Sequence, residues 1–175
     1  MLIGVPLLAV AVALLWYASS DPGRQHAPER EALPAGAGTQ APRDFAEQFT
    51  GDRVPARAVI NGRTFTLEVA RDATSRGRGL GGRDAIADDS GMLFIFPQEG
   101  LHRFWMKDVG FALDLLYIGR DGAVVDIQTM VPEPGVPDGD LTIYEPSAQA
   151  LLALEINGGL ALRLGIEPGT VVRFE

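Results

Sequence analysis

The stretch Leu113-Asp-Leu-Leu-Tyr-Ile118 follows closely on Arg103-Phe-Trp-Met-Lys-Asp108. The apolar and aromatic residues of these two runs predict strands at Leu113–Ile118 and Phe104–Met106. Both runs also carry charge. Asp114 lies between two leucines, and Lys107 is the only lysine of the chain. Burying an unpaired charge costs several kcal/mol, so we expect these side chains to be paired or hydrogen-bonded.

Further short strands are predicted on both sides of this region. They are Ala58–Ile60, Thr64–Val69, Met92–Phe96 ending at Pro97, Ala123–Gln128 and Val171–Phe174. The Asn61-Gly62 pair between the first two is the strongest short signal for a hairpin. Leu151–Ile156 is either a strand or part of a helix over Ser147–Asn157, and Leu160–Leu164 is expected to be a short helix.

This pattern predicts the fold class. Many short strands at close spacing, two or three short helices and no regular strand–helix alternation are typical of an α+β protein that is mainly antiparallel β. We expect the sheet to be small, barrel-like and closed or nearly closed.

The segment from Asp72 to Arg83 is rich in glycine and arginine. Thr74–Leu80 is expected to form a helical turn capped by Asp72 or Thr74. A phosphate cradle is conceivable here, but the glycine spacing matches neither a P-loop nor a dinucleotide fingerprint. We therefore expect a flexible turn followed by an arginine, Arg83, that pairs with a carboxylate.

The N-terminal residues 1–20 are expected to be a signal peptide or an N-terminal membrane anchor. Leu2–Ala18 contains no charged residue. Ala18 and Ser20 place small residues at the −3 and −1 positions of a cleavage before Asp21, although a basic n-region is missing. A buried core helix is the alternative. The segment predicts an exported protein, periplasmic or anchored to the membrane on its extracytoplasmic side.

Residues 21–53 are rich in proline, alanine, glycine and charge, which predicts a disordered tether. Asp44–Gly51 within it is either a short helix, with Phe45 and Phe49 on one face, or more tether. Residues 54–175 are expected to form a single β-rich domain.

Composition narrows the classes of function. The formal net charge of −8 argues against nucleic acid and against electrostatic docking on anionic lipid. Cysteine is absent, so a thiolate metal site, a disulfide framework and a cysteine nucleophile are excluded. His26 and His102 are the only histidines, which excludes a multi-histidine metal site. We expect no cofactor and no metal.

Five ordered motifs resemble one known family. They are G-L-x-x-R (Gly79, Leu80, Arg83), G-M-L-F-x-F-P (Gly91 to Pro97), F-W-M-K (Phe104 to Lys107), L-D (Leu113, Asp114) and L-E-I-N-x-G (Leu154 to Gly159). In this combination the chain resembles the domain-of-unknown-function 192 family over about Phe65 to Phe174. The resemblance implies a compact, β-rich, often exported domain and no established activity.

The chain departs from the family pattern near the lysine. Asp108 and Val109 stand where the family usually has Asn-Thr, Ala112 replaces a proline, and Gly81 and Gly82 replace a methionine and an aromatic residue. The change at position 108 adds a carboxylate beside Lys107.

Six residues are ligand-binding candidates; five come from three of the motifs, and Asp108 directly follows one of them. They are Trp105, Lys107, Asp108, Asp114, Glu155 and Asn157. If the neighbouring strands pair, Lys107 can reach Asp114 and hold its carboxylate charged. Trp105 is either a stacking platform or a core residue, and strand alternation predicts that only one of Phe104 and Trp105 is deeply buried.

Three hypotheses of function follow from these residues. The first is an exported or membrane-tethered, non-catalytic binding or envelope-support module, whose partner is an unknown small polar ligand or an envelope protein. The second is a hydrolase or lyase acting on envelope carbohydrate or peptide, with Asp114 and Glu155 as paired acid and base. The third is a purely structural interaction module with an exposed apolar patch rather than a pocket. For the charged residues themselves, the alternative to a ligand site is a partly buried ion-pair network that fixes strand register.

Overall fold

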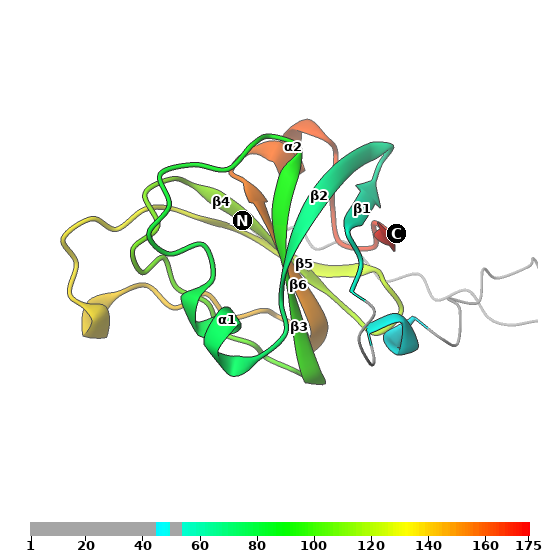
Figure 1. Cartoon of the computed structure of the whole chain (residues 1–175), viewed down its shortest axis with the longest axis horizontal. Helices are drawn as coiled ribbons and strands as arrows, with labels where there is room; N and C mark the ends of the chain where they lie inside the picture. Colours follow the sequence, from blue (N-terminus) through cyan, green and yellow to red (C-terminus); the bar gives the residue numbers. More distant parts are fainter. Residues whose placement is uncertain (1–44, 50–53) are drawn as a thin grey trace, which may run out of the picture. The chain divides into compact units, whose positions relative to one another are not determined.

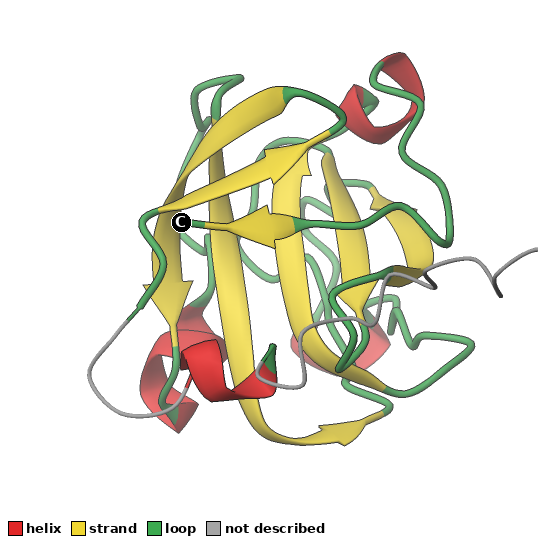
Figure 2. Cartoon of the chain, turned by 90° about the vertical axis from the view of Figure 1, so that its right-hand side faces the viewer, coloured by secondary structure: helices red, strands yellow, loops and turns green. Residues whose placement is uncertain are grey.

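Seven strands form one sheet, in the order β5-β4-β6-β3-β2-β1-β7 (Figures 1 and 2). The structure is a computed structural model that describes residues 45–49 and 54–175. The strands are β1 (Arg57–Ile60), β2 (Arg63–Ala70), β3 (Ser90–Gly100), β4 (Leu113–Ile118), β5 (Val124–Met130), β6 (Ala150–Asn157) and β7 (Arg173–Phe174). Neighbouring strands are antiparallel except β2 and β3, which run parallel. The connection between these two contains α1 (Ala73–Arg78), as a parallel pair needs a crossover.

The sheet is an open half-barrel, so the expected closure, or near closure, of the sheet into a barrel is wrong. Its edges are β5 and β7. The isolated bridge Ala123–Val171 lies between them. β7 is only two residues long, so it is too short to close the barrel by pairing along β5. The prediction of a mainly antiparallel β fold with few short helices is confirmed, because one strand pair alone is parallel and α1 and α2 (Leu160–Arg163) are the only α-helices among the described residues.

Several predicted elements are confirmed. Asn61 and Gly62 both have positive φ, 46° and 80°, as a type I′ turn between β1 and β2 requires. The β4–β5 hairpin is present, with Gly122 at φ 80° in its turn. The ambiguous segment before Asn157 is the strand β6. The helical turn after Asp72 is α1, whose first N–H groups donate to the Asp72 carboxylate.

Two predicted strands differ from the structure. Phe104–Met106 is not a strand, because only Phe104 makes a bridge, an isolated one to Tyr144. Its side chains still alternate as expected: Phe104 is 9% exposed and Trp105 49%. β3 does not end at Pro97 but continues to Gly100, with a register break between Ile95 and Gly100 that accommodates the missing proline N–H.

Both faces of the sheet centre are buried. One hydrophobic cluster contains Leu116 and Ile118 of β4 together with Leu160 and Ala161 of α2. A second cluster, on the opposite face, contains residues such as Leu115 of β4 and the loop residues around Phe104. Successive strand side chains point to opposite faces, so β4 feeds both clusters alternately. This explains why the predicted strand Leu113–Ile118 reads as an almost continuous apolar run.

Residues 45–49 pack against the domain, although they lie within the range 21–53 assigned to a tether. Ala46–Phe49 is a 3₁₀ helix. Phe45 is 5% exposed, and its ring centroid lies 5.2 Å from that of Phe49 and 5.9 Å from that of Phe174. The expected signal or anchor at 1–20, and the rest of the expected tether, lie outside the described residues. Within the described ranges, no helix is long and apolar enough to span a membrane.

Candidate functional site

Asp114 and Glu155 lie on opposite faces of the sheet. In the β4–β6 ladder, Leu115 is the Cα partner of Glu155, while Asp114 is opposite Ile156. Partners across a ladder point to the same face, and neighbours along a strand point to opposite faces. Glu155 therefore shares a face with Leu115, and Asp114 shares the other with Ile156. The paired-carboxylate arrangement that a hydrolase would need is not present.

Asp114 is a structural carboxylate. Its side chain is 1% exposed and accepts a hydrogen bond on each oxygen: from the Thr129 hydroxyl on β5 and from the Ala161 backbone N–H, both at 2.8 Å. α2 begins after Gly159, which offers no side chain to cap the helix. The Asp114 carboxylate therefore performs the capping role from a neighbouring strand, and it ties α2 to the sheet.

Glu155 is in the opposite situation. It is 4% exposed, and its Oε2 atom is buried with no hydrogen-bond partner among the described residues. Its Cα partners are Met92 on β3 and Leu115 on β4, both apolar. Burial disfavours the charged form and raises the pKa of Glu155 to about 8. At neutral pH the carboxyl group is therefore mostly protonated.

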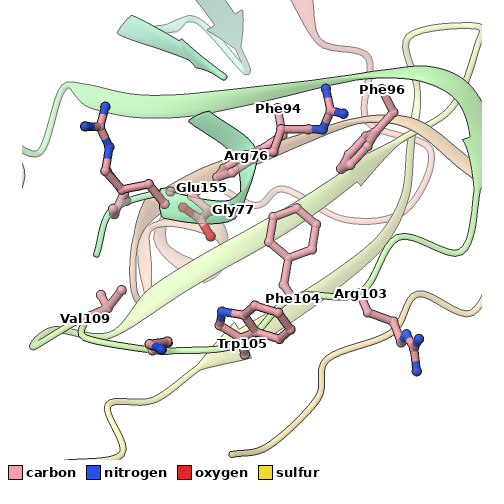
Figure 3. Close-up of a pocket in the computed structure, with 13 residues that line it drawn as sticks. Arg76, Gly77, Phe94, Phe96, Arg103, Phe104, Trp105, Val109 and Glu155 are labelled. Atoms are coloured by element: carbon pink, nitrogen blue, oxygen red, sulfur yellow. The ribbon is translucent and has the colours of Figure 1, made fainter. Parts of the chain in front are cut away.

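The carboxyl group of Glu155 faces a cavity of about 210 Å³ (Figure 3). One wall consists of α1 together with Gly79 and Leu80, which follow it. Phe94 and Phe96 of β3 form a second wall, and the loop from Arg103 to Val109 forms a third. Figure 3 shows Glu155 at the centre of these walls, with Phe104 and Trp105 on one side and α1 on another. The site is thus a cavity lined by aromatic and aliphatic side chains, four basic side chains and one carboxyl group.

Aromatic rings dominate the chamber. Phe94 and Phe104 meet edge to face, with centroids 5.0 Å apart and ring planes at 85°. Trp105, which follows Phe104, is half exposed where the loop meets solvent. Of the predicted ligand-binding residues, Trp105, Lys107 and Glu155 line this cavity, whereas Asp114 does not.

Lys107 does not pair with Asp114, so that prediction is wrong. Its ammonium group forms an exposed ion pair with Asp138, which belongs to the loop after β5. The hydrogen bond to Asp138 raises the pKa of Lys107. Asp108, the other expected partner, has φ 56°, and its backbone carbonyl accepts from the Gly82 N–H at 2.8 Å. Asparagine and aspartate tolerate this left-handed conformation best among non-glycine residues, which is a physical reason for either residue at this position.

Asn157 holds a loop rather than facing the cavity. Its side-chain amide donates to the Ile86 carbonyl at 3.0 Å and to an Asp88 carboxylate oxygen at 2.9 Å. The predicted pairing of Arg83 is confirmed, because its guanidinium binds both Glu68 oxygens, at 2.5 and 2.6 Å. These contacts fix the connection between β2 and β3. This connection contains α1, which lines the cavity.

Sequence reasoning missed the contribution of α1 and β3 to the site. Phe94, Gly77 and Arg76 line the cavity but were not among the candidates. In the sequence, Phe94 is one of several apolar residues of a predicted strand, so no signal marks it as a site residue. The structure identifies it as one because it lies on the same face of the sheet as Glu155. In the described part of the chain, no group of three histidine or acidic side chains is placed to hold a metal ion.

These features define a small, mostly β domain with a carboxyl-bearing apolar cavity on one face of a half-barrel. The chain belongs to the domain-of-unknown-function 192 family, DUF192, described as an uncharacterised conserved family, which matches residues 56–174. No protein with a curated description matches the chain.

Two solved structures are similar to this chain. A protein of unknown function from Novosphingobium aromaticivorans is 35% identical, with a TM-score of 0.60 over 69% of this chain and 84% of its own. A protein from Sinorhizobium meliloti, provisionally described as a transcription regulator, is 34% identical, with a TM-score of 0.57 over 71% of this chain and 98% of its own. The fold and the family are therefore shown.

Replacing Asp114 tests its capping role. Asp114→Ala removes both acceptors and leaves the Ala161 N–H buried without a partner, so we expect a loss of about 2–4 kcal/mol in the free energy of unfolding. Asp114→Asn keeps one oxygen for Ala161, and its amide can donate to the Thr129 hydroxyl, so the loss should be smaller. Urea titrations of both variants measure this. Equal losses, or none for Asp114→Ala, would contradict the capping role.

The pKa of Glu155 makes stability depend on pH. The carboxyl group has a pKa of 4.5 when unperturbed and about 8 in the folded chain. Between these values the folded state keeps a proton that the unfolded state has lost, so stability falls as pH rises through this window. Relative to wild type, Glu155→Gln should therefore gain about a few kcal/mol between roughly pH 5 and pH 8.5. Denaturant titrations across that range check this, with Glu167→Gln as the exposed control. A difference that is constant with pH would show that Glu155 is not perturbed.

Proposed function

We propose that this protein is a non-catalytic binding module for a small ligand, exported or tethered to the membrane. The observation that carries the binding role is that Glu155 lines a cavity while its Oε2 atom is buried without a hydrogen-bond partner among the described residues. An unsatisfied buried polar atom costs roughly 1–3 kcal/mol, which a ligand that supplies the missing hydrogen bond would recover.

The size of the cavity limits the ligand. Sites for drug-sized molecules are roughly 300–1,000 Å³. A dry cavity of about 150 Å³ in another protein holds a benzene ring. The Glu155 cavity, at about 210 Å³, therefore fits a single ring or short chain with one polar group. Half-exposed Trp105 at its edge offers a ring face to such a ligand.

In the hydrolase alternative, Asp114 is the second carboxylate, but it does not line the cavity with Glu155. Asp114 is sealed in the opposite core, with both oxygens already hydrogen-bonded. A glycosidase needs two carboxyl groups flanking one bond at roughly 5 to 9.5 Å. Glu155 therefore stands without the partner that this chemistry requires.

A protein-docking role is the second candidate. The isolated bridge between Phe104 and Tyr144 sets Trp105 beside Ile143, and both are about half exposed, at 49% and 47%. An envelope protein could cover these two side chains. This role would require Trp105 but not Glu155. The description of the Sinorhizobium relative as a transcription regulator finds no support in the net charge of −8, since DNA binding needs a basic surface.

The proposal of export rests on the uncharged run Leu2–Ala18 and the small residues before Asp21. Fractionation of cells that produce the full-length chain tests it. We expect the protein in the periplasm or the membrane, and we expect Leu14→Arg, which breaks the apolar run, to keep it in the cytoplasm. A cytoplasmic wild-type protein would contradict export and leave the binding role standing.

Three ring compounds of matched size test the binding role. In a Trp16→Phe chain, Trp105 is the only tryptophan, so its fluorescence reports on the cavity alone. We expect at least one of benzylamine, benzyl alcohol and benzoate to change this fluorescence saturably at millimolar concentration, because each places a ring among aromatic walls. Free N-acetyltryptophanamide is the control for collisional quenching. A linear response to all three compounds would contradict a binding cavity.

A further inference from the structure

The geometry points to a small organic cation, a protonated amine carried on an apolar ring or short chain, as the ligand of the Glu155 cavity. This inference rests on the proposed binding role and specifies its chemistry. Two features of the same chamber support it independently: a carboxyl group without a partner, and aromatic rings that surround it.

Glu155 is the only acidic side chain that lines the cavity in the described part of the chain. Its Oε2 atom receives no hydrogen bond from the described residues, so a donor group on a ligand can bind there. An ammonium group supplies both a donor and the opposite charge, which makes the strongest class of hydrogen bond. A bound carboxylate would instead face a like group and would have to share its proton.

The aromatic walls favour the same ligand. A cation over the face of tryptophan, tyrosine or phenylalanine is attracted by the electrons of the ring, and the attraction grows where water is excluded. Phe94 and Phe104 are buried, and half-exposed Trp105 keeps part of its ring uncovered. Phe94, Phe104 and Trp105 line the same cavity as Glu155, and Figure 3 shows Phe104 and Trp105 on one side of it, so a ligand beside this carboxyl group lies next to aromatic side chains.

The basic side chains of the cavity lie at its rim. They are Arg76 and Arg78 on α1, and Arg103 and Lys107 on the loop. Arg76 donates to the carbonyls of Arg71 and Ile95, and Lys107 is paired with Asp138. Figure 3 shows the guanidinium groups of Arg76 and Arg103 directed away from Glu155. Arg78, Arg103 and Lys107 are exposed, where salt screens their charges, whereas Arg76 is half-buried. None of them donates a hydrogen bond to the Oε2 atom of Glu155.

The remaining titratable groups near Glu155 do not compete for its proton. Tyr117 of β4, two residues from the cross-strand partner of Glu155, is buried and donates to the Tyr144 carbonyl at 3.1 Å. Burial raises the pKa of Tyr117, so it stays neutral. On β2, Glu68 is held by Arg83 in a two-bond ion pair. Glu155 is therefore the group whose protonation responds to a ligand.

Binding of an amine must release a proton. At neutral pH, Glu155 is mostly protonated, since its pKa is about 8. A bound ammonium group stabilises the carboxylate, so the carboxyl proton passes to solvent while the ligand keeps its own. A neutral alcohol leaves that proton in place, and a carboxylate ligand retains or takes up a proton. The sign of proton exchange therefore identifies the ligand class.

Titration calorimetry with benzylamine at pH 7, in two buffers of different ionisation enthalpy, measures this exchange. We expect release of close to one proton per ligand, and tighter binding at pH 8 than at pH 6. Glu155→Gln should weaken benzylamine binding at least tenfold and abolish proton release, while benzyl alcohol binding should change little. Trp105→Ala should weaken binding of both compounds, because it removes a wall of the chamber.

The outcomes separate the inference from the proposed function. Benzyl alcohol or benzoate binding without benzylamine would overturn the organic cation and leave the binding cavity standing. Benzylamine binding that releases no proton, or that is equally strong in Glu155→Gln, would also overturn it. If none of the three compounds binds, both the cation and the cavity role fail. Circular dichroism of Glu155→Gln confirms that this variant is folded.

Discussion

The register between β4 and β6 is the constraint on which the rest of the structure depends. These two strands are neighbours in the half-barrel, and both of their faces are buried. A shift of one residue would move every side chain of a strand to the opposite face. In the observed register, Asp114 enters one core and Glu155 the other. Two carboxyl groups that stand close in the sheet therefore have separate environments and separate roles.

The roles of Asp114 and Glu155 follow from the different surroundings of their carboxyl groups. Asp114 meets a hydroxyl group and a backbone N–H, so its burial is compensated, and it fixes α2 against the sheet. Glu155 meets apolar side chains and empty space, so its burial is not compensated within the described residues. A stable fold needs the first arrangement and gains nothing from the second. We therefore attribute the second to ligand binding.

Sequence reasoning singled out Trp105, Lys107 and Glu155, which line one cavity, but not the residues with which they are grouped. The Asn61-Gly62 hairpin and the strand Leu113–Ile118 were predictable, because turn chemistry and apolar runs are local signals. The pairing of Lys107 with Asp138 was not, because it joins two loops through space. The order of the strands could not be predicted from the sequence either. The parallel pairing of β2 and β3 depends on how the segment between them crosses the sheet.

The central claim is that Glu155 is a neutral, unpaired carboxyl group at neutral pH. Carbon-13 NMR of the glutamate side chains, with Glu155 assigned by its absence in Glu155→Gln, measures its titration directly. We predict a midpoint near pH 8 for the free protein. A midpoint near the unperturbed pKa of 4.5 would show that solvent or a cation already satisfies this carboxylate, and it would contradict the account.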